Sequence, residues 1–204
     1  MSILREAQFL AALAGAGFPV SSVAAIRERY DPLPSGLAEL LLEWIPRLED
    51  RRLQESVVWA LLAVRKGTLD GAKLSELFDS ATNDDLKRAI ASVIQQTRPR
   101  NIEEWLLLAV RDRRSGNSRH LLAAAVSKML PPERARPVLV EAFQNAPLAI
   151  VHALGKVGDE SVRAFFVSQL PTATGPLQRE LRQAISRIER QLEKVRRRTI
   201  LRET

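Results

Sequence analysis

The chain has 204 residues, of which 46% are hydrophobic and 27% are charged. These fractions are typical of a globular protein with a core, and no apolar run is long enough for a transmembrane helix. There is no cysteine, which excludes disulfides and thiolate chemistry and favours a cytoplasmic protein, while the net charge of +7 favours an anionic partner.

The first predicted element is an amphipathic helix at the N-terminus. In MSILREAQFLAALAGAGFPV the apolar residues recur at helical spacing, and Arg5 and Glu6 interrupt the apolar stretch. A secretory signal peptide is the alternative interpretation of such a segment. The charged pair and the helical period favour a helix of the folded protein.

From residue 36 onward, predicted helices follow one another in pairs. Turn residues separate the helices at Glu49-Asp50, Asn83-Asp84-Asp85, Ser115-Gly116-Asn117 and Gly158-Asp159. Pro131-Pro132 ends one helix, and Pro132 suits the first turn of the next one. No segment alternates apolar and polar residues as a strand would, so the sequence predicts an all-α fold.

The second helices of the pairs align on one apolar position that recurs every 28 to 33 residues. This anchor column is Leu61, Val93, Val126, Leu154 and Ile185. The column before it holds only small residues, which are Ala60, Ser92, Ala125, Ala153 and Ala184. Small side chains at one recurring position predict burial where helices approach closely. Because a two-helix unit of this length cannot bury its apolar face alone, we expect the units to stack.

The period, the paired helices and the segment HALGKVGDESV at residues 152–162 resemble HEAT-like repeats, especially the short bacterial type. The resemblance covers roughly residues 36–192. It implies an α-α superhelix, or α-solenoid, of about five helix pairs with an N-terminal helical cap. The expected single domain 1–204 then comprises a cap, 1–35, and repeat units at 36–67, 68–99, 100–130, 131–158 and 159–204.

HEAT-like arrays mostly bind other macromolecules, so the resemblance implies a non-enzymatic binding module or scaffold whose second helices line a concave side. On these helices, the positions facing away from the predicted core carry five Lys or Arg residues and a single carboxylate, Glu55. Ala63 and Ala91 fall on the same stripe. The predicted groove residues are Trp59, Lys87, His120, Lys128, His152, Lys156, Arg179, Gln183 and Arg187.

We interpret this stripe as a basic concave groove that binds a protein with an acidic face. The alternative is a solvated face whose charges have no partner. DNA or RNA binding through the same groove and the basic C-terminal helix is a further alternative. Alkylpurine DNA glycosylases are also HEAT-like and basic, but Trp59 and Glu55 are the only tryptophan and carboxylate of this stripe.

No catalytic residue, cofactor or metal site is predicted. The two histidines, His120 and His152, are 32 residues apart and form no helical metal-binding pair. Trp44 and Trp105 lie on apolar stripes and are expected in the core. Arg119 is expected to point toward a repeat interface and to form a salt bridge with a neighbouring carboxylate.

Overall fold

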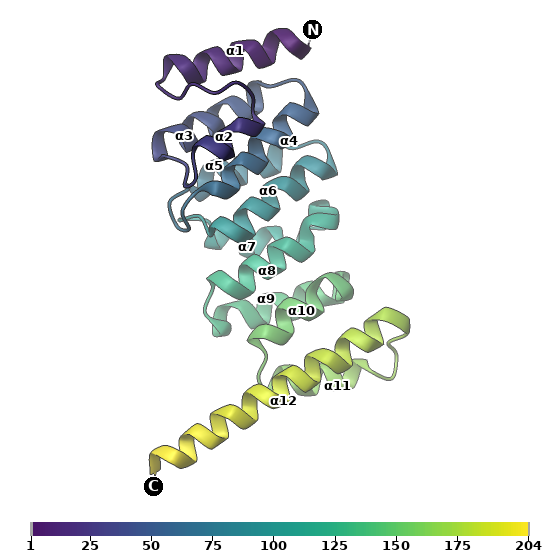
Figure 1. Ribbon diagram of the computed structural model, residues 1–204. Helices are drawn as coiled ribbons and strands as arrows, with labels where there is room; N and C mark the ends of the chain where they lie inside the picture. Colours follow the sequence, from purple (N-terminus) through teal and green to yellow (C-terminus); the bar gives the residue numbers. More distant parts are fainter. Residues whose placement is uncertain (1, 204) are drawn as a thin grey trace. The chain divides into compact units, whose positions relative to one another are not determined.

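A computed structural model describes the backbone of residues 2–203 and the side chains of residues 6–197 (Figure 1). These residues form twelve α-helices and three 3-10 helices, and no β-strand occurs among them, so the predicted all-α fold is confirmed. The chain divides into two compact units, Met1–Trp105 and Leu106–Thr204. Within the described part of the chain, no helix combines the length and the apolar character that a membrane span requires.

The first unit is built by helices that pack on their neighbours in the chain. Helix α4 contacts α2, α3 and α6, and α5 contacts α6. The bounds of the elements are α1 Ser2–Gly15, α2 Ala24–Arg29, α3 Ser35–Trp44, η1 Ile45–Arg47, α4 Arg51–Ala60, η2 Leu61–Ala63, α5 Gly71–Ser80 and α6 Asp84–Thr97.

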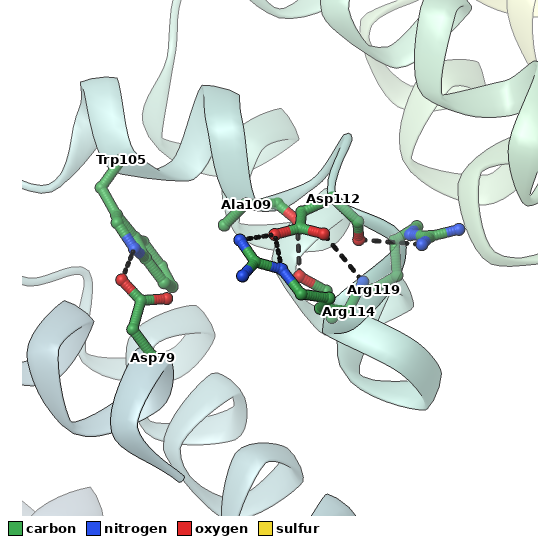
Figure 2. A network of polar contacts seen from close by, with 7 residues as sticks. Asp79, Trp105, Ala109, Asp112, Arg114 and Arg119 are labelled. Atoms are coloured by element: carbon green, nitrogen blue, oxygen red, sulfur yellow. Dashed lines mark hydrogen bonds and ion pairs between the residues drawn. The ribbon is translucent and has the colours of Figure 1, made fainter. Parts of the chain in front are cut away.

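Two tryptophans of the first unit form aromatic contacts between helices. Trp44 on α3 meets Phe9 on α1 edge to face, with the ring centroids 5.6 Å apart. Trp105, at the start of α7 (Glu103–Ala109), meets Phe78 at 5.3 Å. Its indole N–H donates a hydrogen bond to Asp79 Oδ2 over 3.0 Å (Figure 2). Both tryptophans are half-buried, so each lies at the edge of the core in which the sequence pattern placed it.

The second unit is organised around α10, which packs against α8, α9 and α12 (Figure 1). Phe143 on α9 contacts Phe165 and Phe166 on α11, with ring centroids 5.3 and 5.8 Å away. The bounds of its elements after α7 are η3 Arg113–Ser118, α8 Arg119–Met129, α9 Pro132–Asn145, α10 Pro147–Val157, α11 Glu160–Gln169 and α12 Gly175–Glu203.

The helices begin where the turn residues predict that they should. Asp50 caps α4 by accepting a hydrogen bond from the Leu53 N–H, and Asn83 caps α6 in the same way. Asp159 caps α11 by accepting hydrogen bonds from two backbone N–H groups. Pro132 is the first residue of α9, where its missing N–H costs nothing. These turn predictions are confirmed.

The five small residues of the aligned column are all buried, as the alignment predicts. Their exposed fractions lie between 0 and 7%, in the order Ala60 1%, Ser92 7%, Ala125 0%, Ala153 2% and Ala184 2%. The α-solenoid and its five repeat units stay predictions.

Two positions of the outward stripe behave differently from the prediction. Ala63 and Ala91 are buried rather than solvent-facing. For Ala63 the reason is local, because residues 61–63 form a 3-10 turn, which rotates each residue by about 120° instead of 100° and brings the side chain inward. Ala91 lies within the regular helix α6, where more of the helix surface is buried than the apolar face predicted from the sequence.

Candidate functional site

The candidate site lies at a close contact between α10 and α12. Gly155 on α10 is buried, and a Cβ atom added to it would lie 3.0 Å from the Ala184 Cβ on α12. Such a distance is shorter than an ordinary carbon–carbon contact. The glycine therefore permits the two helix backbones to come together, and side chains that flank this contact are brought within reach of each other.

Three basic side chains gather at this contact, and we call them the basic cluster: His152, Lys156 and Arg187. His152 and Lys156 are four residues apart on α10 and share one face of the helix. Arg187 comes from α12 and places its Nη1 atom 3.5 Å from His152 Nδ1. His152 and Lys156 are exposed and Arg187 is half-buried, so the cluster is open to solvent.

The electrostatics of the cluster favour an anion. Partial desolvation is the largest cause that lowers the pKa of His152 below its usual 6.5, followed by the charges of Lys156 and Arg187, while Glu180 acts in the opposite direction. The imidazole is therefore mostly neutral at pH 7 and stands beside two permanent cations. A carboxylate or phosphate bound here would offset the repulsion between Lys156 and Arg187 and could accept a hydrogen bond from the imidazole.

Four more of the predicted groove residues lie on α12 and α8. Arg179 and Gln183 precede Arg187 by eight and four residues, lie on the same helix face and are exposed. On α8, His120 and Lys128 are also exposed. The Nδ1 atom of His120 is 2.7 Å from the carbonyl oxygen of Asn117, a distance at which the protonated Nδ1 donates a hydrogen bond.

An apolar cavity of about 530 Å³ adjoins the basic surface in the second unit. Its lining includes His120 from α8, Leu148 from α10 and Leu177 from α12. Leu148 is 54% exposed and lies one helical turn before His152. Leu148 also belongs to the outward stripe, six residues before the anchor residue Leu154, but it gave no sign of a site because isolated exposed leucines are ordinary.

The remaining two predicted groove residues, Trp59 and Lys87, belong to the first unit. The Lys87 Nζ atom lies 5.6 Å from the centroid of the Phe78 ring, within the range of a cation–π contact. Trp59 is 37% exposed and lines a cavity of about 720 Å³ together with carboxylates. A single groove that contains all nine predicted residues stays a prediction.

Arg119 lies inside the second unit, although its polar partner differs from the predicted one. Its side chain is only 6% exposed, and Nη2 donates a hydrogen bond over 2.9 Å to the backbone carbonyl of Asp112 (Figure 2). The predicted salt bridge with a neighbouring carboxylate is therefore wrong. The Asp112 carboxylate instead accepts hydrogen bonds from the backbone and side chain of Arg114, which fixes the turn before α8.

The chemistry that these residues offer is recognition of charge. Within the described residues, no three His, Cys, Asp or Glu side chains are grouped so that they could hold a metal ion. Two permanent cations, a neutral imidazole and an adjoining apolar cavity are suited to a partner that carries both carboxylates and an apolar side chain. Comparison of the chain with models of protein families, with curated proteins and with solved structures found no match.

Proposed function

We propose that this protein is a non-enzymatic binding module that holds an acidic segment of a partner protein on the basic cluster of α10 and α12. The observation that carries the proposal is the convergence of Lys156 and Arg187 on His152 at the Gly155–Ala184 contact. Ion pairs of such partly exposed cations are individually weak, so recognition needs several carboxylates together.

The adjoining cavity indicates what else the partner segment carries. Leu148 and Lys156 are eight residues apart on α10, which corresponds to about 12 Å along a helix with a rise of 1.5 Å per residue. An extended peptide covers that distance in about four residues. A segment with an apolar side chain about four residues from its carboxylates would therefore contact the cavity and the basic cluster at once.

The wider architecture is also a proposal. We infer a cytoplasmic α-solenoid of about five HEAT-like helix pairs, preceded by a helical cap. The burial of all five small residues in the aligned column supports this inference, since stacked second helices need small side chains at their closest approach. Such an array suits a scaffold that presents side chains from successive helices to one extended partner.

The proposal is tested with a fluorescein-labelled hexaglutamate peptide and fluorescence anisotropy. We expect saturable binding at low salt and a five- to thirtyfold weaker affinity in the double variant Lys156→Gln, Arg187→Gln, which corresponds to about 1–2 kcal/mol for two ion pairs. The matched control is Arg190→Gln, Lys194→Gln, which removes the same amount of charge from two exposed positions of α12. An equal loss of affinity in the two double variants would mean that only net charge matters, and this would overturn the proposed site.

The same variants separate a protein partner from nucleic acid. A short single-stranded oligonucleotide and its duplex are titrated in parallel over a range of salt concentrations. Tighter binding of either one than of hexaglutamate, with log affinity falling linearly against log salt and weakened by the Lys156, Arg187 variant, would replace the acidic protein segment by DNA or RNA.

A further inference from the structure

The first unit contains a second cavity, of about 720 Å³, whose charge is opposite to that of the basic cluster. Residues of α1, of the segment 22–31 and of α4 line it. Its apolar lining includes Val23, Leu53 and Trp59. Nothing in the sequence pattern indicates this cavity, because its walls come from segments far apart in the chain.

Trp59 is the largest side chain in the lining and differs from the other two tryptophans. Trp44 contacts the Phe9 ring and the guanidinium of Arg47, and Trp105 contacts the Phe78 ring and Asp79. Among residues 6–197, no other aromatic ring and no cation lies against the Trp59 indole, which is 37% exposed. The indole therefore offers an open aromatic face inside a concave site.

The charged groups of the lining are three carboxylates, Glu6, Glu28 and Asp31, and one cation, Arg27. Within the described side chains, none of the three carboxylates takes part in an ion pair. Glu55 lies one turn before Trp59 on α4 and adds a further carboxylate on the same helix face. The charge of the cavity is thus negative around an exposed tryptophan.

We propose that this cavity binds the guanidinium group of an arginine side chain that a basic protein segment presents. A planar guanidinium stacks on an indole face and donates paired hydrogen bonds to a carboxylate, which an ammonium group cannot do in the same geometry. Trp59 would provide the stacking surface, and Glu28 and Asp31, which are exposed residues of the same lining, would accept the hydrogen bonds. This inference does not depend on the function proposed for α10 and α12.

The test is a titration of ¹⁵N-labelled protein with a tetra-arginine peptide at physiological salt, followed through the indole N–H signals of the three tryptophans. The Trp59→Phe variant assigns the signal of Trp59. We expect this signal to shift in a saturable way while those of Trp44 and Trp105 stay in place. Tetralysine should bind more weakly, and tetraglutamate should leave the Trp59 signal unchanged. A shift of equal size with tetralysine would overturn the arginine-specific site.

Variants at the carboxylates and at the ring complete the test. We expect the double variant Glu28→Gln, Asp31→Asn to raise the apparent Kd for tetra-arginine at least fivefold. We expect the same increase in Trp59→Leu, which removes the aromatic ring but keeps the lining apolar. The control is Glu39→Gln, Glu76→Gln, which removes two exposed carboxylates of the same unit that do not line the cavity. An unchanged Kd in the Glu28, Asp31 variant, or an equal loss in the control, would overturn the proposal.

Discussion

The close contact between α10 and α12 predicts that Ala184→Leu destabilises the protein and weakens the basic cluster. Ala184 is 2% exposed, and its Cβ already occupies the space that a Cβ on Gly155 would need. Leucine adds three carbon atoms at a point with no free volume. Overpacking of this kind costs about 1–3 kcal/mol, and the small difference in helix propensity between alanine and leucine does not change the result.

The measurement is urea unfolding followed by circular dichroism. With an m-value of about 1–3 kcal/mol per molar urea, a loss of about 2 kcal/mol lowers the midpoint by roughly 1 M. The control is Ser186→Leu, which places the same side chain at an exposed position of α12 and should leave the midpoint nearly unchanged.

Binding gives a second readout of the same variant. Arg187 lies on α12 three residues after Ala184, so a helix pushed away from α10 carries the guanidinium away from His152. We expect weaker hexaglutamate binding in Ala184→Leu than in Ser186→Leu. If Ala184→Leu and Ser186→Leu have the same urea midpoint and the same affinity for hexaglutamate, the two helices are not in tight contact at Ala184. The structural basis of the basic cluster is then refuted.

Three further predictions concern single residues. Burial raises the pKa of Asp159, but hydrogen bonds at the start of α11 outweigh this effect and lower the pKa overall. Asp159→Ala should therefore lower the free energy of unfolding by about 1–2 kcal/mol at pH 7. The resulting difference in urea midpoint should shrink as the pH falls below 3.8, because the carboxylate of the wild-type protein then becomes protonated. A Cβ on Gly71 would lie 2.4 Å from the backbone oxygen of Arg100, so Gly71→Ala should lose about 2–4 kcal/mol in urea unfolding, whereas Gly15→Ala, with nothing within 4 Å, should lose none. Hexaglutamate affinity should rise from pH 7 to 5.5 as His152 gains charge beside the permanent cations, and an unchanged pH dependence in His152→Ala would contradict this.

The helices could be predicted because their signals are local. A helix start needs only a side-chain acceptor two or three residues before a free N–H, and Asp50, Asn83 and Asp159 provide it. The burial of the small column followed from helical phase alone. The phase argument failed at Ala63, where the helix tightens into a 3-10 turn, because nothing in the sequence marks the change of pitch.

The candidate site could be predicted only in part for the same reason. Lys156 and Arg187 could be predicted because each lies two residues after a recurring apolar residue of its helix. The close contact between α10 and α12 at Gly155 then brings the side chains of the two helices together. The hydrogen-bond partner of Arg119 could not be predicted. It is the backbone carbonyl of Asp112, and because every residue carries such a carbonyl, the pattern of side chains does not indicate which one is used.

The two cavities show why charge summed over a chain is a weak guide to what the chain binds. The net charge of +7 favours an anionic partner, and the predicted basic groove includes Trp59, yet the cavity beside Trp59 is lined by Glu6, Glu28 and Asp31. Ion pairs and stacking act over a few ångströms, and salt screens charges about 8–10 Å away, so each cavity responds to its own lining. If both proposals hold, the partner surfaces must be acidic at the second unit and carry arginine at the first, and a uniformly acidic partner would leave the Trp59 cavity empty.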